Sequence, residues 1–132
     1  MAIYTKCIFK KPEDIDGERI SVMSRHTLND GITKDERITG KSYDAWLRIL
    51  APQSIFVGAY LRKDITWKEF EKNYLLFLKE PYNILEIKFL AKKGLEKDIT
   101  LLCSEETADK CHRRLLAEEC QKHEPKLIVE HR

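Results

Sequence analysis

Short apolar runs and polar connections alternate along the first forty residues. Residues 3–9 and 19–23 are rich in apolar and β-branched side chains, which predicts two strands. Residues 10–17 lie between them and contain Pro12 and Gly17, which favour a turn. Residues 24–41 are polar and show no sustained period, so we expect an irregular loop there. Loops of this length in compact domains are usually functional or mobile.

Two shorter apolar segments follow the loop. Ser42 is suited to cap a helix that runs to Leu50 and ends before Pro52. The apolar face of this helix would carry Trp46, Ile49 and Leu50. Residues 54–61 are apolar throughout and fit either a strand or a helix.

Two longer helices are predicted next. Thr66 and Glu69 have the spacing of a capping box. The apolar residues behind it recur at helical steps and are Phe70, Tyr74, Phe77 and Leu78. A further helix is expected to begin at Asn83 as its cap and to end at Gly94. Its apolar face would carry Leu85, Phe89 and Leu90.

The last third of the chain returns to strands. Residues 98–103 predict a short buried strand, residues 107–122 a helix, and residues 127–130 a final strand. Helices between strands are typical of α/β proteins. We therefore expect residues 1–132 to form a single-domain α/β layer sandwich, with a small, mainly parallel sheet flanked by helices.

Composition excludes several classes of protein. The 24 basic and 22 acidic residues give a net charge of +2, which is too small for a dedicated nucleic-acid surface. The sequence lacks an apolar run of about 18 residues and the layout of a signal peptide, so we expect a cytoplasmic protein without a membrane partner. Composition gives no indication of oligomeric state. The Lys- and Glu-rich composition, with two Gln and three Asn, is typical of heat-adapted proteins.

The segment from Cys103 to Arg114 carries the candidate chemistry. Cys103 closes a predicted strand, and Cys111, His112 and Arg113 open the helix after it. The start of a helix that follows a strand is a ready site for anions and reactive groups. The four cysteines of a chain that is not exported are expected to be reduced thiols.

Cys111 is the predicted nucleophile, because the positive end of a helix dipole favours a thiolate. At about 100° per residue, His112 points toward the sheet and Arg113 toward solvent or the mouth of the site. Glu119 lies in the middle of the apolar arc and requires a charged partner or a helix that overshoots the sheet. The alternatives are that Cys103 and Cys111 are small core residues and that His112 is a core histidine bonded to a carbonyl.

Ser24, Arg25 and His26 follow the second predicted strand directly. If that strand runs parallel to the one ending at Cys103, both ends emerge at the same sheet edge, where such folds bind ligands. Arg25 and His26 would then face the cysteine site across one crevice. The alternative is the solvated start of a loop.

A metal site is not expected. Zinc requires three or four ligands, and the seven residues between Cys103 and Cys111 differ from the tight spacing of structural zinc sites. The two thiols would come within coordinating range only if the turn between them folded back over the sheet edge. We therefore expect neither a metal nor another cofactor.

Residues 98–117 read Asp-Ile-Thr-Leu-Leu-Cys-Ser-Glu-Glu-Thr-Ala-Asp-Lys-Cys-His-Arg-Arg-Leu-Leu-Ala, and they resemble the signature of the domain of unknown function 488 family, which includes the YeaO-like proteins. The similarity extends to the segments around Trp46 and Trp67. The site positions that match are Cys103, Glu105, Cys111, His112 and Arg113, with Ser24 and Arg25 matching an early polar motif. Ala108 stands where the family often has proline, and His26 lies in a loop particular to a subgroup. The resemblance implies an α/β fold and a cytoplasmic setting, and it brings no established reaction.

Two functions from different classes fit these observations. In the first, Cys111 or His112 acts on a small anionic or nucleotide-like ligand held by Arg113, Arg25 and the helix start, while Cys103 and Glu105 orient the reacting group. In the second, the Cys-His-Arg cluster is a buried network that supports a non-catalytic binding module.

Overall fold

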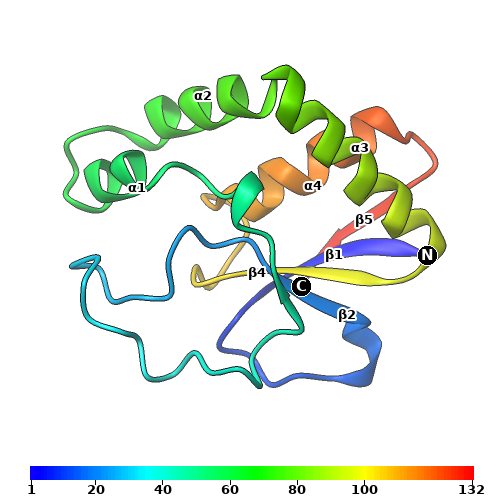
Figure 1. Cartoon of the computed structure of the whole chain (residues 1–132), viewed down its shortest axis with the longest axis horizontal. Helices are drawn as coiled ribbons and strands as arrows, with labels where there is room; N and C mark the ends of the chain where they lie inside the picture. Colours follow the sequence, from blue (N-terminus) through cyan, green and yellow to red (C-terminus); the bar gives the residue numbers. More distant parts are fainter.

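The computed structural model describes residues 1–132 and contains five strands and four α-helices. The strands are β1 (Ala2–Cys7), β2 (Glu18–Ser21), β3 (Ala45–Trp46), β4 (Ile99–Cys103) and β5 (Ile128–His131). The helices are α1 (Ser54–Leu61), α2 (Trp67–Leu78), α3 (Pro81–Glu96) and α4 (His112–His123), with short 3-10 helices at Asp14–Asp16 and Arg48–Leu50. All strands are parallel, in the order β3-β2-β4-β1-β5 (Figure 1). The predicted α/β fold is confirmed.

The helices cover one face of the sheet (Figure 1). Helix α4 contacts β1, β4 and β5, and α3 packs beside it against β1. The strands present alternate side chains to this layer, so Ile3, Ile99 and Leu101 form one fully buried core with Leu116 of α4. None of the helices is long and apolar enough to pass through a membrane.

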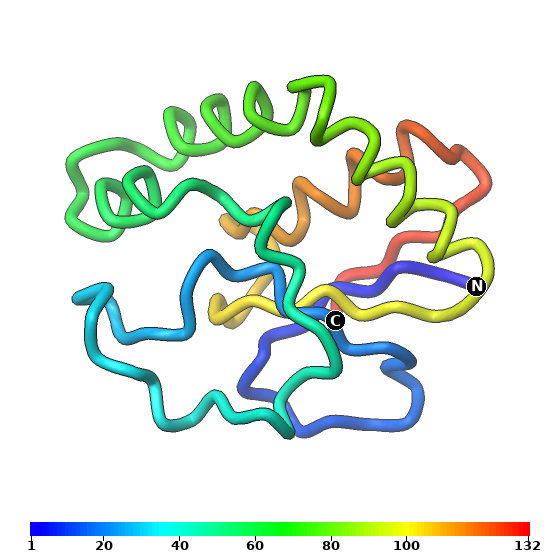
Figure 2. Tube along the Cα trace, viewed as in Figure 1, coloured from blue at the N-terminus to red at the C-terminus, as the bar shows by residue number.

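Residues 24–41 are irregular, as predicted, and follow an extended path beside the sheet (Figure 2). One isolated bridge between Thr27 and Lys34 is the loop's single element of pairing. Thr66 and Glu69 form the predicted capping box at the start of α2, and residues 54–61 prove to be a helix.

The helix predicted for residues 42–50 is wrong. Ala45 and Trp46 instead pair with β2 as the edge strand β3, and a 3-10 turn follows. The Trp46 indole N–H donates to the Met23 carbonyl oxygen at 2.6 Å. Pairing with an open sheet edge therefore outweighs the local helical pattern, which has few turns over which to accumulate stability.

The limits of the last two helices also differ from the prediction. Helix α3 begins at Pro81, so Asn83 lies in its first turn and does not cap it. The Asn83 side chain donates to the carbonyl oxygen of Phe77 at the end of α2. Gly94 lies inside α3 and does not end it. A Cβ at this position would lie 2.7 Å from Ile3 Cγ1, so only glycine lets the helix pack this closely on β1. Helix α4 begins at His112 rather than near residue 107, and Glu119 has the expected charged partner in Lys122 at 2.8 Å.

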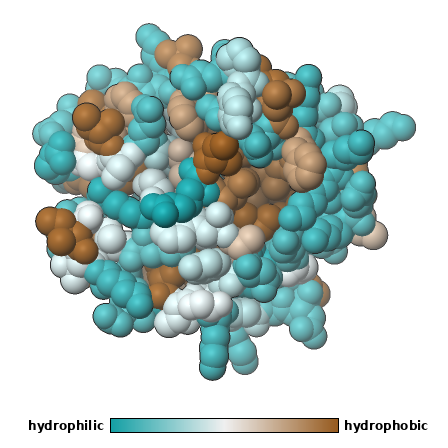
Figure 3. Space-filling model, in the orientation of Figure 1, coloured by the Kyte–Doolittle hydropathy of each residue, from teal (hydrophilic) through white to brown (hydrophobic).

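The outer side of α3 leaves apolar side chains exposed. Tyr82, Leu85 and Phe89 point away from the core, contrary to the predicted placement of Leu85 and Phe89 on the apolar face. Figure 3 shows apolar side chains gathered in a hollow on this side of the molecule. Phe89 lines a groove there together with Trp46 of β3.

A buried ion-pair network covers the face of the sheet opposite the helices. Asp16 is fully buried, and its carboxylate accepts from Lys6 Nζ at 3.0 Å and from Arg19 at 2.6 Å. Burial tends to raise the pKa of Asp16, but hydrogen bonds from the Glu13 backbone, Lys6 and Arg19 outweigh this effect and lower it. The network fixes the connection between β1 and β2.

Asp16→Asn is expected to lower the free energy of unfolding by about 3 to 5 kcal/mol, because it leaves two buried cations without their shared anion. Because the native pKa of Asp16 is lowered, its stabilising effect is present at neutral pH and is lost as the pH falls through that value. The variant should therefore lose less stability on acidification than the wild type. Urea unfolding at neutral and acidic pH measures both effects, with exposed Asp14→Asn as the control. Equal stability of the two variants would contradict a structural role for the network.

Candidate functional site

The parallel pairing of β2 and β4 brings their carboxyl ends to the same sheet edge, as predicted. Ser21 lies opposite Leu102 in the register, so Val22 and Cys103 leave the sheet side by side. The Val22 amide continues the ladder by donating to the Leu102 carbonyl oxygen at 3.0 Å. Two segments far apart in the sequence, residues 22–29 and 103–112, therefore meet beyond this edge.

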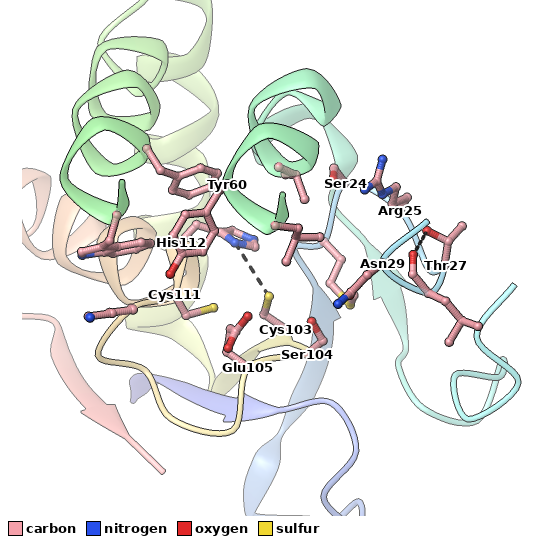
Figure 4. Close-up of a pocket in the computed structure, with 17 residues that line it drawn as sticks. Ser24, Arg25, Thr27, Asn29, Tyr60, Cys103, Ser104, Glu105, Cys111 and His112 are labelled. Carbon is pink, nitrogen blue, oxygen red and sulfur yellow. Dashed lines mark hydrogen bonds between the residues drawn. The ribbon is translucent and has the colours of Figure 1, made fainter. Parts of the chain in front are cut away.

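A cavity of about 90 Å³ opens between these segments and helices α1 and α2 (Figure 4). Most of the predicted site residues line it: Ser24, Arg25, Cys103, Glu105, Cys111 and His112. The crevice inferred from the two strand ends is therefore present. Its floor is formed by thiols and an imidazole.

Cys103 and His112 form the central pair of the site. Cys103 Sγ lies 3.7 Å from His112 Nδ1, the contact that is dashed in Figure 4. His112 Nε2 lies 2.7 Å from the Val22 carbonyl oxygen, so this nitrogen carries a proton and donates. Nδ1 therefore either accepts the Cys103 proton or, once protonated, donates to a Cys103 thiolate.

The surroundings of Cys103 favour the thiolate. The pKa of Cys103 lies well below its ordinary value, because a hydrogen bond from Cys111 and the charge of His112 outweigh burial. Burial tends to lower the pKa of His112, but the neighbouring Cys103 sulfur and the Val22 carbonyl raise it. Both shifts favour the charged pair of a thiolate and an imidazolium, in which each group stabilises the other's charged form.

Cys111 has the opposite tendency. It is the N-cap of α4, and burial, followed by the proximity of Cys103, raises its pKa well above the ordinary value. Of the two thiols, Cys103 is therefore the one whose surroundings favour the thiolate, whereas the helix dipole alone favoured Cys111.

Arg113 is fully buried, and its predicted position toward solvent or the mouth is wrong. Its guanidinium donates to the Glu105 carbonyl oxygen at 2.8 Å and to Cys111 Sγ at 3.3 Å. The irregular segment between β4 and α4 folds back over this side chain, a tertiary contact that a helical wheel does not contain. Arg113 Nε and Nη2 have no hydrogen-bond partner. Arg113 therefore supports the thiols from behind and does not line the cavity.

Glu105 lines the cavity beside Cys103 (Figure 4). Its backbone amide contributes to stabilising the Cys103 thiolate. Burial, followed by the charge of Cys103, raises the pKa of the Glu105 carboxyl, so this side chain is a candidate proton donor.

A comparison with protein families accounts for most of the chain. Residues 3–124 match the profile described as the active DUF488-N3 subclade. The chain belongs to the DUF488 family. No curated protein and no solved structure gives a significant match.

His26, like Arg113, is a predicted site residue that lies outside the cavity. Its ring stacks on Trp46 with centroids 3.7 Å apart, and its Nε2 lies 2.7 Å from Ser21 Oγ. It does not line the cavity. Ser24 and Arg25 do line it, whereas Ser21 and Trp46 hold His26 away from it.

Sequence reasoning missed the outer wall of the cavity. Tyr60 of α1 and Trp67 and Phe70 of α2 line it, and Tyr60 and Trp67 meet edge to face with centroids 5.8 Å apart. Lys110 adds a cation to the lining. The apolar composition of residues 54–61 signalled burial, but nothing local indicated that this segment faces Cys103.

Three donor atoms in the cavity could hold one metal ion. The ligand atoms of Cys103, Cys111 and His112 lie within 4.8 Å of one another, so the turn between the cysteines does fold back over the sheet edge. Two cysteines and one histidine with an open position are a known zinc ligand set. Against a divalent ion stands the buried Arg113 guanidinium, which already places a positive charge 3.3 Å from Cys111 Sγ.

Purified protein is expected to contain substoichiometric zinc, and EDTA should leave its melting temperature unchanged, because Arg113 already compensates negative charge on the thiols. Elemental analysis and thermal unfolding with and without chelator test this. About one tightly held zinc ion per chain, with a fall in melting temperature on chelation, would make the three residues ligands.

Proposed function

We propose that the cavity is a thiol-dependent active site, in which the Cys103 thiolate acts on a small anionic ligand. The observation that carries this proposal is the 3.7 Å contact between Cys103 Sγ and His112 Nδ1 at the floor of a cavity. A thiolate beside a histidine that is itself held by another group is the usual arrangement of an activated cysteine nucleophile.

Each neighbour of Cys103 has a role in this chemistry. His112 holds a proton on Nδ1, next to the reacting sulfur, and can pass it to a leaving group. The carbonyl oxygen of Val22 fixes the ring through Nε2. Glu105, with its raised pKa, is a second proton donor on the cavity wall.

The lining of the cavity supports a small ligand with negative charge. Arg25 and Lys110 supply cations, while Tyr60, Trp67 and Phe70 form an aromatic wall that excludes water. A cavity of about 90 Å³ is far below the several hundred Å³ of pockets that enclose drug-sized molecules. Of the two ligand classes considered, a small anion therefore fits better than a nucleotide.

The burial of the Cys-His-Arg cluster favours the second function, a non-catalytic binding module. Cys111 and His112 are 2% and 7% exposed, and Arg113 is fully buried. A buried polar network of this kind also stabilises a fold without reacting. Reactivity of Cys103 separates the two functions, because a structural thiol is inert until the protein unfolds.

Brief treatment with iodoacetamide at neutral pH is expected to alkylate Cys103 before the other cysteines, because its thiolate lines the cavity. Cys120 is the internal reference, since it is fully buried and burial raises its pKa to about 12. Mass-spectrometric mapping of the four sites measures the order of labelling. If Cys103 labels no faster than Cys120, the non-catalytic function is supported.

His112→Gln is expected to slow alkylation of Cys103 at neutral pH roughly tenfold, because the thiol pKa rises once the imidazolium is removed. Glutamine retains a donor for the Val22 carbonyl, so the connection between β2 and α4 can persist. The pH profile of the rate should move to higher pH. His123→Gln, a change at the opposite end of α4, is the matched control. If the pH profile of Cys103 alkylation is the same in His112→Gln as in the wild type, the imidazolium of His112 does not activate Cys103.

Inorganic phosphate is expected to slow the alkylation of Cys103 in the wild type, because Arg25 and Lys110 attract an anion to the cavity. Arg25→Ala should weaken this protection several-fold. Arg62→Ala is the control, since Arg62 is an exposed residue paired with Asp64. Equal protection in both variants would show that Arg25 does not bind the anion.

A further inference from the structure

The proposed nucleophile leaves the second thiol of the cavity without a role. Cys111 lines the same cavity as Cys103, and the donor atoms of Cys103, Cys111 and His112 lie within 4.8 Å of one another. All four cysteines are free thiols, but only these two share the cavity. Cys7 lies opposite Cys103 in the sheet register, and its sulfur instead donates to the Ser104 carbonyl oxygen at 3.6 Å.

The position of the two thiols suits the formation of a bond between them. Cys103 ends β4 and Cys111 caps α4, so each is anchored on a regular element. The seven residues between them, 104–110, contain neither helix nor strand and can adjust as the sulfurs approach each other. Disulfide geometry needs only this local movement when the two side chains already face one another.

We propose that Cys103 and Cys111 are a redox-active dithiol that reduces a small hydroperoxide. This inference rests on the proposed function, because it requires Cys103 to be the nucleophile. In the first step the Cys103 thiolate attacks the terminal oxygen of the hydroperoxide, an S–O bond forms and the O–O bond breaks. The alkoxide that leaves takes the proton from His112 Nδ1 and departs as an alcohol, and Cys103 becomes a sulfenic acid.

In the second step Cys111 resolves the sulfenic acid. The Cys111 sulfur attacks Cys103 Sγ, the S–O bond breaks, and the hydroxide leaves as water with the Cys111 proton. Arg113 donates to Cys111 Sγ at 3.3 Å and so stabilises negative charge on the attacking sulfur. The two sulfurs lose two electrons and the peroxide gains them. An external dithiol is needed to restore the reduced state.

The size of the cavity favours a hydroperoxide as the oxidant. About 90 Å³ admits a molecule of a few heavy atoms, whereas a disulfide substrate would have to bring two bulky groups to a sulfur of a residue that is 6% exposed. Arg25 and Lys110 line the outer part of the site and would accommodate an anionic group on the substrate.

The test adds hydrogen peroxide to the fully reduced wild-type chain and maps the products by mass spectrometry. The expected product is an internal disulfide between Cys103 and Cys111 that dithiothreitol reverses. In Cys111→Ser, Cys103 should instead accumulate as a sulfenic acid that dimedone traps. Cys103→Ser should consume peroxide at least roughly tenfold more slowly than the wild type, since the thiolate is the reacting species. Cys120→Ser is the matched control and should behave as the wild type.

Several results would overturn this inference. A disulfide between Cys103 and Cys7 would remove the resolving role of Cys111, and faster oxidation by glutathione disulfide than by peroxide would overturn the substrate class. If the wild type forms no disulfide although Cys103 is alkylated rapidly, the dithiol fails and the proposed nucleophile stands. If Cys103 resists alkylation as well, both proposals fail. The measurement on the wild type needs no variant to fold.

Discussion

The hydrogen bond between His112 Nε2 and the Val22 carbonyl oxygen determines the chemistry available at the sheet edge. A backbone carbonyl can only accept, so it requires a proton on Nε2 and turns Nδ1 toward Cys103. The bond joins the end of β2 to the start of α4, two segments separated by 90 residues. Displacement of either segment would change the ring's orientation, and with it the state of the thiol. The proposed reactive group therefore depends on the arrangement of the backbone.

Buried charge around the thiols is only partly compensated by neighbouring groups. Arg113 brings a positive charge into the interior, where an unpaired ion would be costly. The Glu105 carbonyl oxygen and the Cys111 sulfur accept from its Nη1, while Cys103 compensates the imidazolium of His112. Two of the Arg113 nitrogens stay unpaired, so the compensation is incomplete. An incompletely compensated cation favours negative charge on nearby sulfur, which is the property that a thiol site requires.

The sequence predicted those parts of the fold that depend on local pattern. The strand ending at Cys103 and the capping box at Thr66 were both predicted, because a buried strand requires apolar residues and a helix cap requires particular polar ones. The prediction of a short helix at residues 42–50 was wrong, because the strand edge of β2 with which this segment pairs is distant in the sequence. Gly94 resembled a helix end but is required by the close approach of Ile3.

The site was predicted in position more accurately than in detail. Ser24, Arg25, Cys103, Glu105, Cys111 and His112 meet at one cavity, as the rule for parallel strand ends implied. The spacing could not show which cysteine sulfur contacts the imidazole, because that contact depends on how the segment between β4 and α4 folds. Arg113 was misplaced because a helical wheel assumes that the preceding loop stays away from the helix. Tyr60 and Trp67 were missed because their position depends on how α1 and α2 pack.

Strand β1 is made long before the strands with which it pairs. It is synthesised before every other strand of the sheet, yet its neighbours are β4 and β5, which begin at Ile99 and Ile128. At about 5 to 20 residues per second, a ribosome needs several seconds to produce those partners. During that time both hydrogen-bonding edges of a strand with five buried residues out of six are open. β1 thus stays unpaired and prone to association while the residues between it and β4 are added, and the sheet is complete only after β5 has been made.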